Sequence, residues 1–495
     1  MPHENLTPGA AESSAAGAAV GRRTFLAAAA AAAFAGGSAV RAMAAEGAGS
    51  AAAPLEPTSD PVANTARLQR AIDAAALAAD PRIVVPPGRW EITTLFLRSR
   101  VHLELAPGAV LTAARNLDLF PQRPWDVDRK ARSYYLIFAE NCSDIVVSGR
   151  GSIDGNSPSF ATAPSTWDPK IRAKIVHTSP LVQLQRCQRV GLRGITLRDS
   201  PSWTVHLLDC DDVRVEAITI DNDLYLIGND GLDIDGCRNV VVSNCFIRAC
   251  DDNICIKSRR TARSSEYISV TNCVLESTCS AIGLGAESWN SIRYVAVSNC
   301  AVRNSIRLVQ IILWDGGTVE HVVLTNLTGR AMTTLGTDRV LHFDIQQHLG
   351  ENPRLGTLRH VVASNITCET RGRVLLTAQD GATMSDITLR DVRIVYPEVE
   401  DPAVTVPRSG STELSNFSPE ARVARAAVVA DNVAGLVLEN VAAVWPSDPA
   451  RVAAPMHGLW GRKLRGGLID CPLLTSSSPA AERYALQACD PLIRG

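Results

Sequence analysis

The chain has 495 residues, a formal net charge of −2 at neutral pH, and a hydrophobic content of 46%. This length allows two or three ordinary domains, or one long repetitive domain with a sizeable buried core. The near-zero charge, with arginines scattered along the chain, argues against the basic surface that a nucleic-acid-binding protein needs. We therefore expect no nucleic-acid partner.

Residues 1–44 have the pattern of an export signal. The pair Arg22-Arg23 precedes a weakly apolar, alanine-rich run, and the sequence AMA at its end supplies a small-x-small cleavage site. The run is too short and too poor in leucine and isoleucine for a membrane anchor, and no other segment approaches about 18 consecutive apolar residues. We expect a twin-arginine signal peptide, a flexible linker over residues 45–60, and a secreted protein with no membrane partner.

Residues 64–80, NTARLQRAIDAAALAAD, predict an amphipathic helix. Leu68, Ile72 and Ala75 recur at helical spacing and share one face of it. The helix directly precedes a long repetitive region. We expect it to cap the first strands of that region, because the open end of a repeat structure has to be covered.

From about residue 80 onward, short Val/Ile-rich strands alternate with Asn, Gly or Asp turns. The clearest copies are RNVVVSNCFI, EYISVTNCVL and RYVAVSNCAV, which begin at residues 238, 266 and 293. A period of this length indicates stacked structural units. Since each unit consists of short β-branched strands, we predict an all-β parallel β-helix whose coils stack at about 4.8 Å.

An asparagine recurs at the same place in the repeats. Stacking of the coils would join these side-chain amides in a ladder formed by Asn244, Asn272, Asn299, Asn326 and Asn365. A β-propeller is the alternative architecture, but a blade of four strands needs about 40 residues. The shorter repeat therefore favours the β-helix.

Six of the 13 cysteines also occupy equivalent positions in the repeats, namely Cys187, Cys210, Cys237, Cys245, Cys273 and Cys300. We expect stacked free thiols in the core, because free cysteine packs as a small hydrophobic side chain. One disulfide, between Cys471 and Cys489, is expected near the C-terminus. The β-helix is expected to span residues 61–475, with a long polar loop at 400–420 and a tail at 476–495.

Five aspartates interrupt the buried-strand sequence of residues 228–258. Because residues one repeat apart lie on neighbouring coils, Asp230 and the pair Asp251-Asp252 are expected to meet on one face. Asp233 and Asp235 share one side of a strand there. Closely packed carboxylates raise the pKa of one group while another stays ionised. An acid beside a base is what hydrolysis of a glycosidic bond requires.

Two other interpretations of the acidic cluster are a Ca²⁺ site and the capping of coil corners. A Ca²⁺ site favours loop-borne, glycine-spaced oxygens rather than carboxylates embedded in strand sequence. We therefore expect no metal and no cofactor.

The sequence GNDGLDIDGC, followed by CDDNICIKS, resembles the motifs of the polygalacturonase-type pectinases, glycoside hydrolase family 28. Similar stretches at 85–113, 147–157 and 199–215 extend the resemblance over roughly residues 60–400. It implies a right-handed parallel β-helix and inverting hydrolysis. We expect a pectin-type substrate and a monomeric protein. The resemblance also implies that Asp252 or Asp251 is the general acid, with Asp230 and the other member of the pair handling the water.

The chain departs from that family pattern at several positions. Ser280 stands where the family has a histidine, and Gln310 and Ile312 replace the cations of an Arg-Ile-Lys element that grips a uronate carboxylate. Gly228 replaces the leading asparagine of the first motif. These changes favour a rhamnogalacturonan, a substituted uronan or a neutral glycan over plain polygalacturonan. A non-catalytic carbohydrate-binding β-helix and a uronate lyase or epimerase are the alternatives.

Further side chains are expected to line the cleft around the acids. The predicted substrate-binding set is Lys257, His206, Asp233, Ser280, Glu287, Gln310, Trp314 and Arg293. Arg259 and Arg307 are additional candidates for binding a carboxylate, and Trp203 and Trp289 for stacking on a sugar ring. The competing interpretation of each is a solvated surface residue or a packed core residue.

Overall fold

The computed structural model describes residues 55–121, 134–164, 172–174, 179–333, 338–347, 354–409 and 418–494. The expected signal peptide and most of the expected linker lie outside the described residues. No helix within the described ranges is long and apolar enough to cross a membrane.

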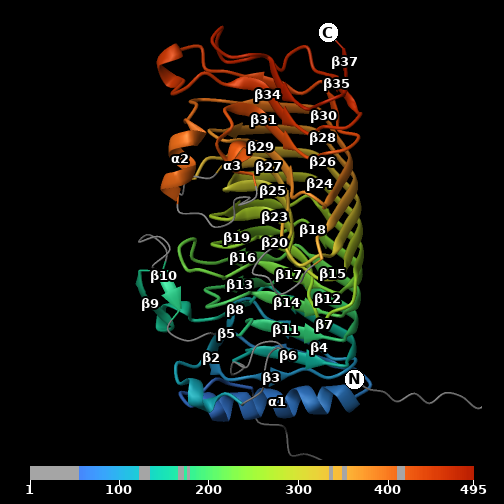
Figure 1. The fold of residues 1–495 in the computed structure, drawn as a ribbon. Coiled ribbons are helices and arrows are strands. Elements are labelled where there is room, and N and C mark those ends of the chain that lie inside the picture. The colour runs from blue at the N-terminus through green and yellow to red at the C-terminus, as the bar shows by residue number, and fades with distance from the viewer. Residues whose placement is uncertain are drawn as a thin grey trace, which may run out of the picture. The chain divides into compact units, whose positions relative to one another are not determined.

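Nearly all described strands belong to two parallel sheets, sheet A and sheet B, to which successive coils of the chain contribute (Figure 1). Each strand pairs with the equivalent strands of the preceding and following coils. In sheet B, for example, Leu232 pairs with Ile254, and Ile254 pairs with Ile282. This arrangement is a parallel β-helix, as the repeat predicted.

Sheet B carries the acidic motif. Its strands are β3 (Leu95–Phe96), β6 (Ile137–Glu140), β11 (Val182–Gln185), β14 (Val205–Leu208), β17 (Leu232–Asp235), β20 (Ile254–Ser258), β23 (Ser280–Ser288), β25 (Arg307–Leu313), β27 (Arg339–Ile345), β29 (Arg373–Ala378), β31 (Ala426–Asp431), β34 (His457–Arg462) and β36 (Tyr484–Gln487).

Sheet A contains the repeats with the asparagine. Its strands are β1 (Arg82–Val85), β2 (Gly88–Ile92), β4 (His102–Leu105), β5 (Ala109–Ala113), β7 (Ser143–Gly149), β8 (Ser152–Asp154), β12 (Gln188–Arg193), β13 (Thr196–Arg198), β15 (Asp211–Glu216), β16 (Thr219–Asp221), β18 (Arg238–Ser243), β19 (Phe246–Ala249), β21 (Ser265–Thr271), β22 (Val274–Ser277), β24 (Ser291–Asn304), β26 (Thr318–Ala331), β28 (Thr357–Thr370), β30 (Thr383–Val395), β32 (Val437–Glu439), β33 (Ala442–Val444), β35 (Leu468–Asp470) and β37 (Leu492–Arg494).

The remaining elements lie outside these two sheets. They are the antiparallel pair β9 (Ala161–Pro164) and β10 (Arg172–Lys174), the short 3₁₀ helices η1 (Leu117–Leu119), η2 (Ser157–Ser159) and η3 (Pro449–Arg451), and the helices α1 (Pro61–Leu77), α2 (Pro402–Ser409) and α3 (Pro419–Val423).

Helix α1 caps the first coil, as expected. Asp60 is its N-cap and accepts a hydrogen bond from the backbone N–H of Val62. Leu68 and Ile72 are fully buried, and the helix packs against β1, β2 and β3. Its apolar face therefore covers the open end of the stack (Figure 1).

The asparagine ladder explains how the corners of five successive sheet A coils are built. All five asparagines have φ between 51° and 58°, in the left-handed region that asparagine tolerates better than other non-glycine residues. Asn365 donates a hydrogen bond to Asn326 at 2.7 Å, and Asn326 donates to Asn299 at 3.0 Å. The repeated residue therefore serves both the turn and the contact between coils.

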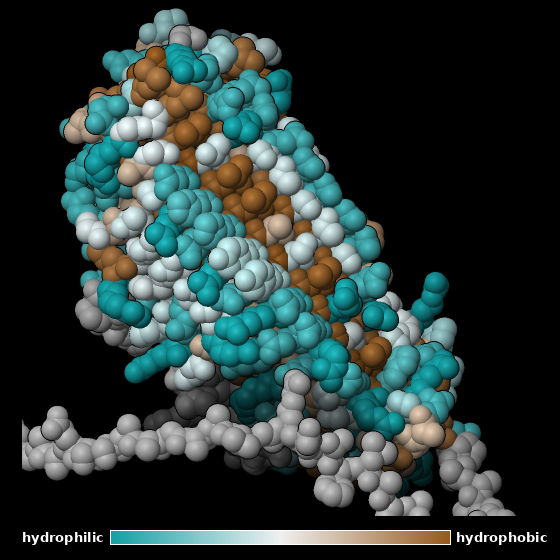
Figure 2. Space-filling model, turned by 90° about the vertical axis from the view of Figure 1, so that its right-hand side faces the viewer, coloured by the Kyte–Doolittle hydropathy of each residue, from teal (hydrophilic) through white to brown (hydrophobic). Residues whose placement is uncertain are grey.

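On the outer face of sheet A, side chains of the same kind recur at equivalent positions of successive coils. Hydrophobic side chains form a lengthwise stripe between hydrophilic rows (Figure 2). Tyr267, Tyr294, His321 and His360 form one continuous stack with ring centroids 5.0–5.2 Å apart. This face is therefore organised by stacking between coils.

All thirteen cysteines are free thiols, and ten of them are buried. The expected stacking is present: the backbone N–H of Cys187 points to the sulfur of Cys210 at 3.4 Å. The expected Cys471–Cys489 disulfide is absent. Each of these two thiols instead accepts a backbone N–H from a neighbouring turn, from Val441 and Leu464 respectively.

The C-terminal boundary differs from the expectation. Residues 476–495 were expected as a tail after the β-helix, but they contain β36 and β37. These strands pair in parallel with β34 and β35, so they add to both sheets. Their weak apolar pattern follows from exposure, since every residue of β37 is exposed.

Candidate active site

The acidic motif occupies neighbouring coils of sheet B. Asp230 lies just before β17, and Asp251 and Asp252 lie just before β20. The backbone N–H of Gly231 donates to the carbonyl of Asp252 at 2.9 Å, which aligns Asp230 with Asp252. The structure thus brings the three predicted catalytic carboxylates together.

The three carboxyl groups differ in exposure and electrostatics. Asp230 is 4% exposed, and burial, followed by the charges of Asp251 and Asp233, holds its pKa well above the usual range. Asp251 is half-buried, and burial together with the charge of Asp252 raises its pKa. Carboxyl groups with raised pKa values retain protons where isolated carboxyl groups lose them.

Asp252 receives hydrogen bonds on both carboxylate oxygens. The backbone N–H of Ser280 donates to Oδ1 at 3.2 Å, and Nε2 of Gln310 donates to Oδ2 at 2.8 Å. An ionised carboxylate accepts at both oxygens, and N–H donors directed at both favour that form. Asp251 and Asp252 therefore occupy different environments, although their oxygens lie within 4.8 Å of each other.

Gln310 reaches Asp252 because the coil between them has a glycine. A Cβ atom at Gly283 would lie 2.5 Å from Oδ2 of Asp252 and 3.1 Å from Nε2 of Gln310. Nη1 of Arg307 donates to Oε1 of Gln310 at 3.3 Å, which orients the amide. Gln310 therefore holds a catalytic candidate in place, a role that its position in the sequence did not suggest.

A buried lysine lies within the acidic cluster. Nζ of Lys257 is 3.5 Å from Oδ1 of Asp233 and 3.4 Å from Oε2 of Glu287. Burial raises the pKa of Asp233 to about 8, and Lys257 opposes that rise. Lys257, Asp233 and Glu287 thus adjoin the acids, but Asp233 is fully buried and so does not line a cleft as predicted.

Trp203 packs beneath these charges. Nζ of Lys257 lies 4.7 Å from the centre of its ring, and Cζ of Arg259 lies 5.5 Å from it. The ring also packs with Tyr135 and Phe138. Trp203 is therefore part of the wall that supports Lys257, through cation–π contacts, rather than a platform for sugar.

His206 is a packed side chain and does not line the cleft as predicted. It is fully buried, with Nδ1 2.7 Å from Oε1 of Gln183 and Nε2 3.4 Å from Oδ2 of Asp235. Burial alone would raise the pKa of Asp235, but Arg259 and His206 together hold it below the usual range. Arg259 therefore forms its ion pair with Asp235.

Three other predicted residues have different surroundings. Arg293 belongs to β24 of sheet A, where it pairs with Glu266, so it is not at the acids. Ser280 is fully buried and presents its backbone N–H to Asp252. Trp314 follows β25 and is half-buried.

Trp289 and Ile312 complete the set of sequence candidates. Trp289 lies against Arg260, whose Cζ is 5.3 Å from the ring centre. Ile312 is 2% exposed, so its apolar side chain is packed.

Sequence reasoning missed two buried polar residues further along sheet B, Arg339 and His342. Arg339 pairs in register with Arg307, and His342 with Gln310. The sequence signal for these residues is that Arg307, Arg339 and Arg373 each occupy the first position of their strand. This signal was missed because the coils that contain them are longer than the clear sheet A repeats.

Asp233 gives the site a testable pH dependence. Its pKa of about 8 in the folded protein, raised by burial, lies far above that of an exposed aspartate. Its contribution to stability is therefore complete below about pH 4 and is lost as the pH rises through 8. Asp233→Asn is expected to exceed the wild type in unfolding free energy at pH 9 by more than about 1 kcal/mol, with a smaller difference at pH 5.

Denaturant unfolding at both pH values measures this effect. The exposed Asp212→Asn is the matched control and should follow the wild type at each pH. If Asp233→Asn showed the same pH dependence as the wild type, the raised pKa of Asp233 would be wrong.

Comparisons with known proteins agree with this architecture. Among curated proteins, the chain is 30% identical over 186 residues to a probable polygalacturonase of Vitis vinifera, which covers 36% of this chain and 37% of that protein. It is 23% identical over 312 residues to an endo-polygalacturonase of Pectobacterium carotovorum subsp. carotovorum, which covers 61% and 76%. The chain thus spans little more than a third of the first relative's length.

A solved structure shows the same fold. The family 28 exopolygalacturonase of Yersinia enterocolitica superposes with a TM-score of 0.64 at 15% identity, covering 87% of this chain and 75% of that one. A family model described as glycosyl hydrolases family 28 matches residues 109–412, which is more than half of the chain. The chain therefore belongs to glycosyl hydrolases family 28.

Proposed function

We propose that this protein is an inverting glycoside hydrolase that cleaves a pectin-type polysaccharide or its oligosaccharides. The observation that carries the proposal is the contrast between two adjacent carboxyl groups. The pKa of Asp251 is raised by burial and by Asp252, whereas both oxygens of Asp252 accept N–H donors. The membership of family 28 supports the same chemistry.

In this proposal Asp251 is the general acid. It is the more exposed member of the pair, and its raised pKa keeps a proton available for the leaving oxygen. Asp252 is the base that activates water, because its hydrogen bonds favour the carboxylate. Asp230, one coil earlier, retains a proton and positions the water against Asp252.

Lys257 has an electrostatic role in the same proposal. Its ammonium group lies among Asp233, Glu287 and the catalytic acids, where it limits repulsion as charge moves during the reaction. It also presents a cation next to the hydroxyl or acidic groups of the sugar beside the cleaved bond.

The substrate class follows from what replaces the Arg-Ile-Lys element. The amide of Gln310 donates its hydrogen bond to Asp252, and Ile312 is apolar and buried, so neither position binds a uronate carboxylate. The relatives named polygalacturonases support a pectin-type chain. A rhamnogalacturonan or a substituted uronan fits both observations better than plain polygalacturonan, and a neutral glycan is the alternative.

We further propose export through the twin-arginine route, on the strength of the Arg22-Arg23 pair and the cleavage site that follows it. Cleavage after residue 44 predicts that the exported protein begins at residue 45. N-terminal sequencing of the secreted protein would show a different start if the assignment were wrong.

Conservative variants of the three acids test the proposed function. Asp251→Asn, Asp252→Asn and Asp230→Asn each remove an ionisable group with little change in shape. Each is expected to lower kcat by about 10²–10⁴-fold, because acid–base catalysis supplies rate enhancement of that order. The assay measures reducing ends released from a panel of pectic and neutral polysaccharides.

The exposed Asp212→Asn is the control and should keep wild-type turnover. Wild-type turnover by all three folded site variants would refute the assignment of the acids. Binding of a glycan by the wild type without release of reducing ends would instead favour a non-catalytic carbohydrate-binding β-helix.

Gln310 tests whether the orientation of Asp252 matters. Gln310→Leu removes the donor to Oδ2 and keeps the approximate volume. We expect kcat to fall by about 10²-fold with little change in KM, because a misplaced catalytic group costs rate of that order. Gln185→Leu, in β11 of the same sheet, is the control. A change confined to KM would show that Gln310 binds substrate instead.

A further inference from the structure

Three arginines form a buried column on sheet B. Arg307, Arg339 and Arg373 pair in register on β25, β27 and β29 and are 1–3% exposed. Arg307 also pairs with Ser280, so the column continues the line of residues that begins at Asp252. It therefore extends from the catalytic candidates along the axis of the β-helix.

Arg339 lacks a carboxylate partner within the described ranges. Its Nη1 donates to the backbone carbonyl of Asp338 at 2.7 Å, while its Nε and Nη2 are buried without a hydrogen-bond partner. The carboxylate of Asp338 is used otherwise, because it accepts from Thr333 and lies 3.5 Å from Arg371. Burial and the charges of Arg373 and Arg307 lower the pKa of Arg339, and the charge of Asp338 offsets this only in part. A buried guanidinium in these surroundings is stabilised by a bound anion.

His342, on the same strand, is also fully buried, without a hydrogen-bond partner for either ring nitrogen in the described part of the chain. Burial and the charges of Arg307, Arg339 and Arg373 hold the pKa of His342 well below its usual range, so the ring is neutral. A neutral imidazole has one N–H donor and one acceptor nitrogen. Buried polar groups in native proteins have partners, including bound ions and water.

We propose that Arg339 and His342 form a carboxylate-binding subsite. Building on the proposed function, its ligand is the carboxylate of a uronate unit in the substrate chain. The guanidinium fork of an arginine matches the two oxygens of a carboxylate, and the imidazole N–H supplies a further donor. Arg307 and Arg373 add positive potential on either side, which excludes a cation and disfavours a neutral group.

The position of the subsite agrees with the altered Arg-Ile-Lys element. Arg339 lies three coils beyond Asp252, or roughly 14 Å at the coil spacing of a β-sheet. A uronate bound there belongs to a sugar a few units from the cleaved bond. The carboxylate-binding position thus lies one coil beyond Gln310 and Ile312, where the chain has no cation.

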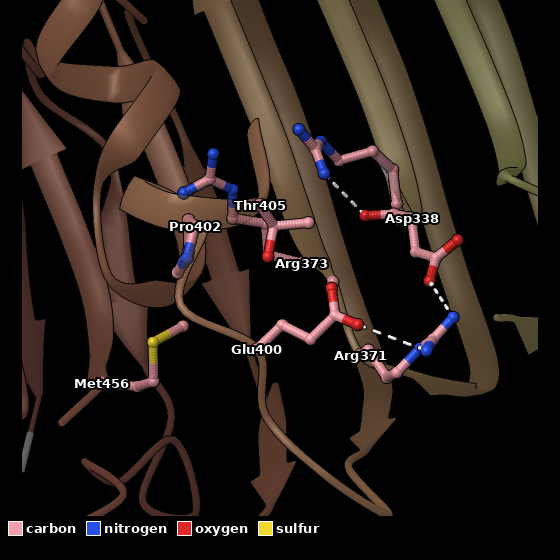
Figure 3. A pocket seen from close by; sticks show the side chains of 9 residues that line it. Asp338, Arg371, Arg373, Glu400, Pro402, Thr405 and Met456 are labelled. Atoms are coloured by element: carbon pink, nitrogen blue, oxygen red, sulfur yellow. Dashed lines mark hydrogen bonds and ion pairs between the residues drawn. The ribbon is translucent and has the colours of Figure 1, made fainter. Parts of the chain in front are cut away.

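A pocket reaches the flank of this subsite. Arg339 is one of its lining residues. Arg373, Glu400, Thr405 and Met456 line it as well (Figure 3). Arg371, at the rim of this pocket, is neutralised by Asp338 and Glu400 (Figure 3). An anion that enters there meets two guanidinium groups, those of Arg339 and Arg373, whose described hydrogen bonds go to backbone carbonyls rather than to carboxylates.

Direct binding of small probes to the full chain tests the proposal. Galacturonate carries the carboxylate, galactose has the same ring without it, and acetate is the carboxylate without the ring. Calorimetry is expected to show binding of galacturonate and none of galactose at the same concentration. Arg339→Gln and His342→Leu are each expected to weaken galacturonate binding at least tenfold. The exposed Arg330→Gln, on sheet A, should leave it unchanged.

Acetate separates the two sources of the carboxylate. Acetate that binds as tightly as galacturonate, and is lost in the same variants, would support the subsite and assign it to free anions. Tighter binding of galacturonate would assign it to the substrate. If Arg339→Gln failed to fold, galacturonate binding by His342→Leu would test the subsite, because this substitution removes no charge.

Two results would overturn the proposal: no carboxylate binds, or galacturonate binding is unchanged in both variants. Neither depends on hydrolysis. A chain that cleaved a pectic glycan but bound no carboxylate would retain the proposed function and lose the subsite. A chain that bound galacturonate through Arg339 but cleaved no glycan would retain the subsite and lose the proposed function.

Discussion

The parallel register between β17 and β20 is the constraint on which the site depends. Leu232 and Ile254 pair inside the core, and this pairing brings Asp230 beside Asp252 at the ends of the two strands. A shift of one residue would turn every outward side chain into the core. The hydrophobic core of the β-helix thus fixes the geometry of the carboxylates, although none of its residues takes part in chemistry.

The same stacking creates the electrostatics. Coils packed at strand spacing force like charges together and exclude water from Asp230 and Asp233, so their pKa values rise. Lys257 offsets part of this repulsion, and the amide of Gln310 stabilises the ionised form of Asp252. Repetition of the coils therefore places carboxyl groups in different electrostatic surroundings without a special loop. Further along the sheet it stacks arginines instead, and there it leaves a place for an anion.

The sequence predicted the parts that follow from periodicity. The recurrent asparagines and the Val/Ile alternation indicated the coils, and the separation of Asp230 from Asp252 indicated neighbouring turns. The sequence-based prediction failed for residues whose role depends on which sheet they belong to or on which side chain they contact. Arg293 has the pattern of an outward residue but lies on sheet A, His206 is outward yet paired with Gln183 and Asp235, and Cys471 and Cys489 find backbone donors instead of each other. Arg339 and His342 were hidden because their coils are longer than the clear repeat.

The central claim is that one carboxyl group donates a proton while another activates water for direct attack on the sugar. The configuration of the first product tests this claim most directly. Proton NMR during cleavage of a defined oligosaccharide is expected to show the inverted anomer before mutarotation. A first product with retained configuration would require a covalent intermediate, and an unsaturated product would indicate elimination. Either result would contradict the account.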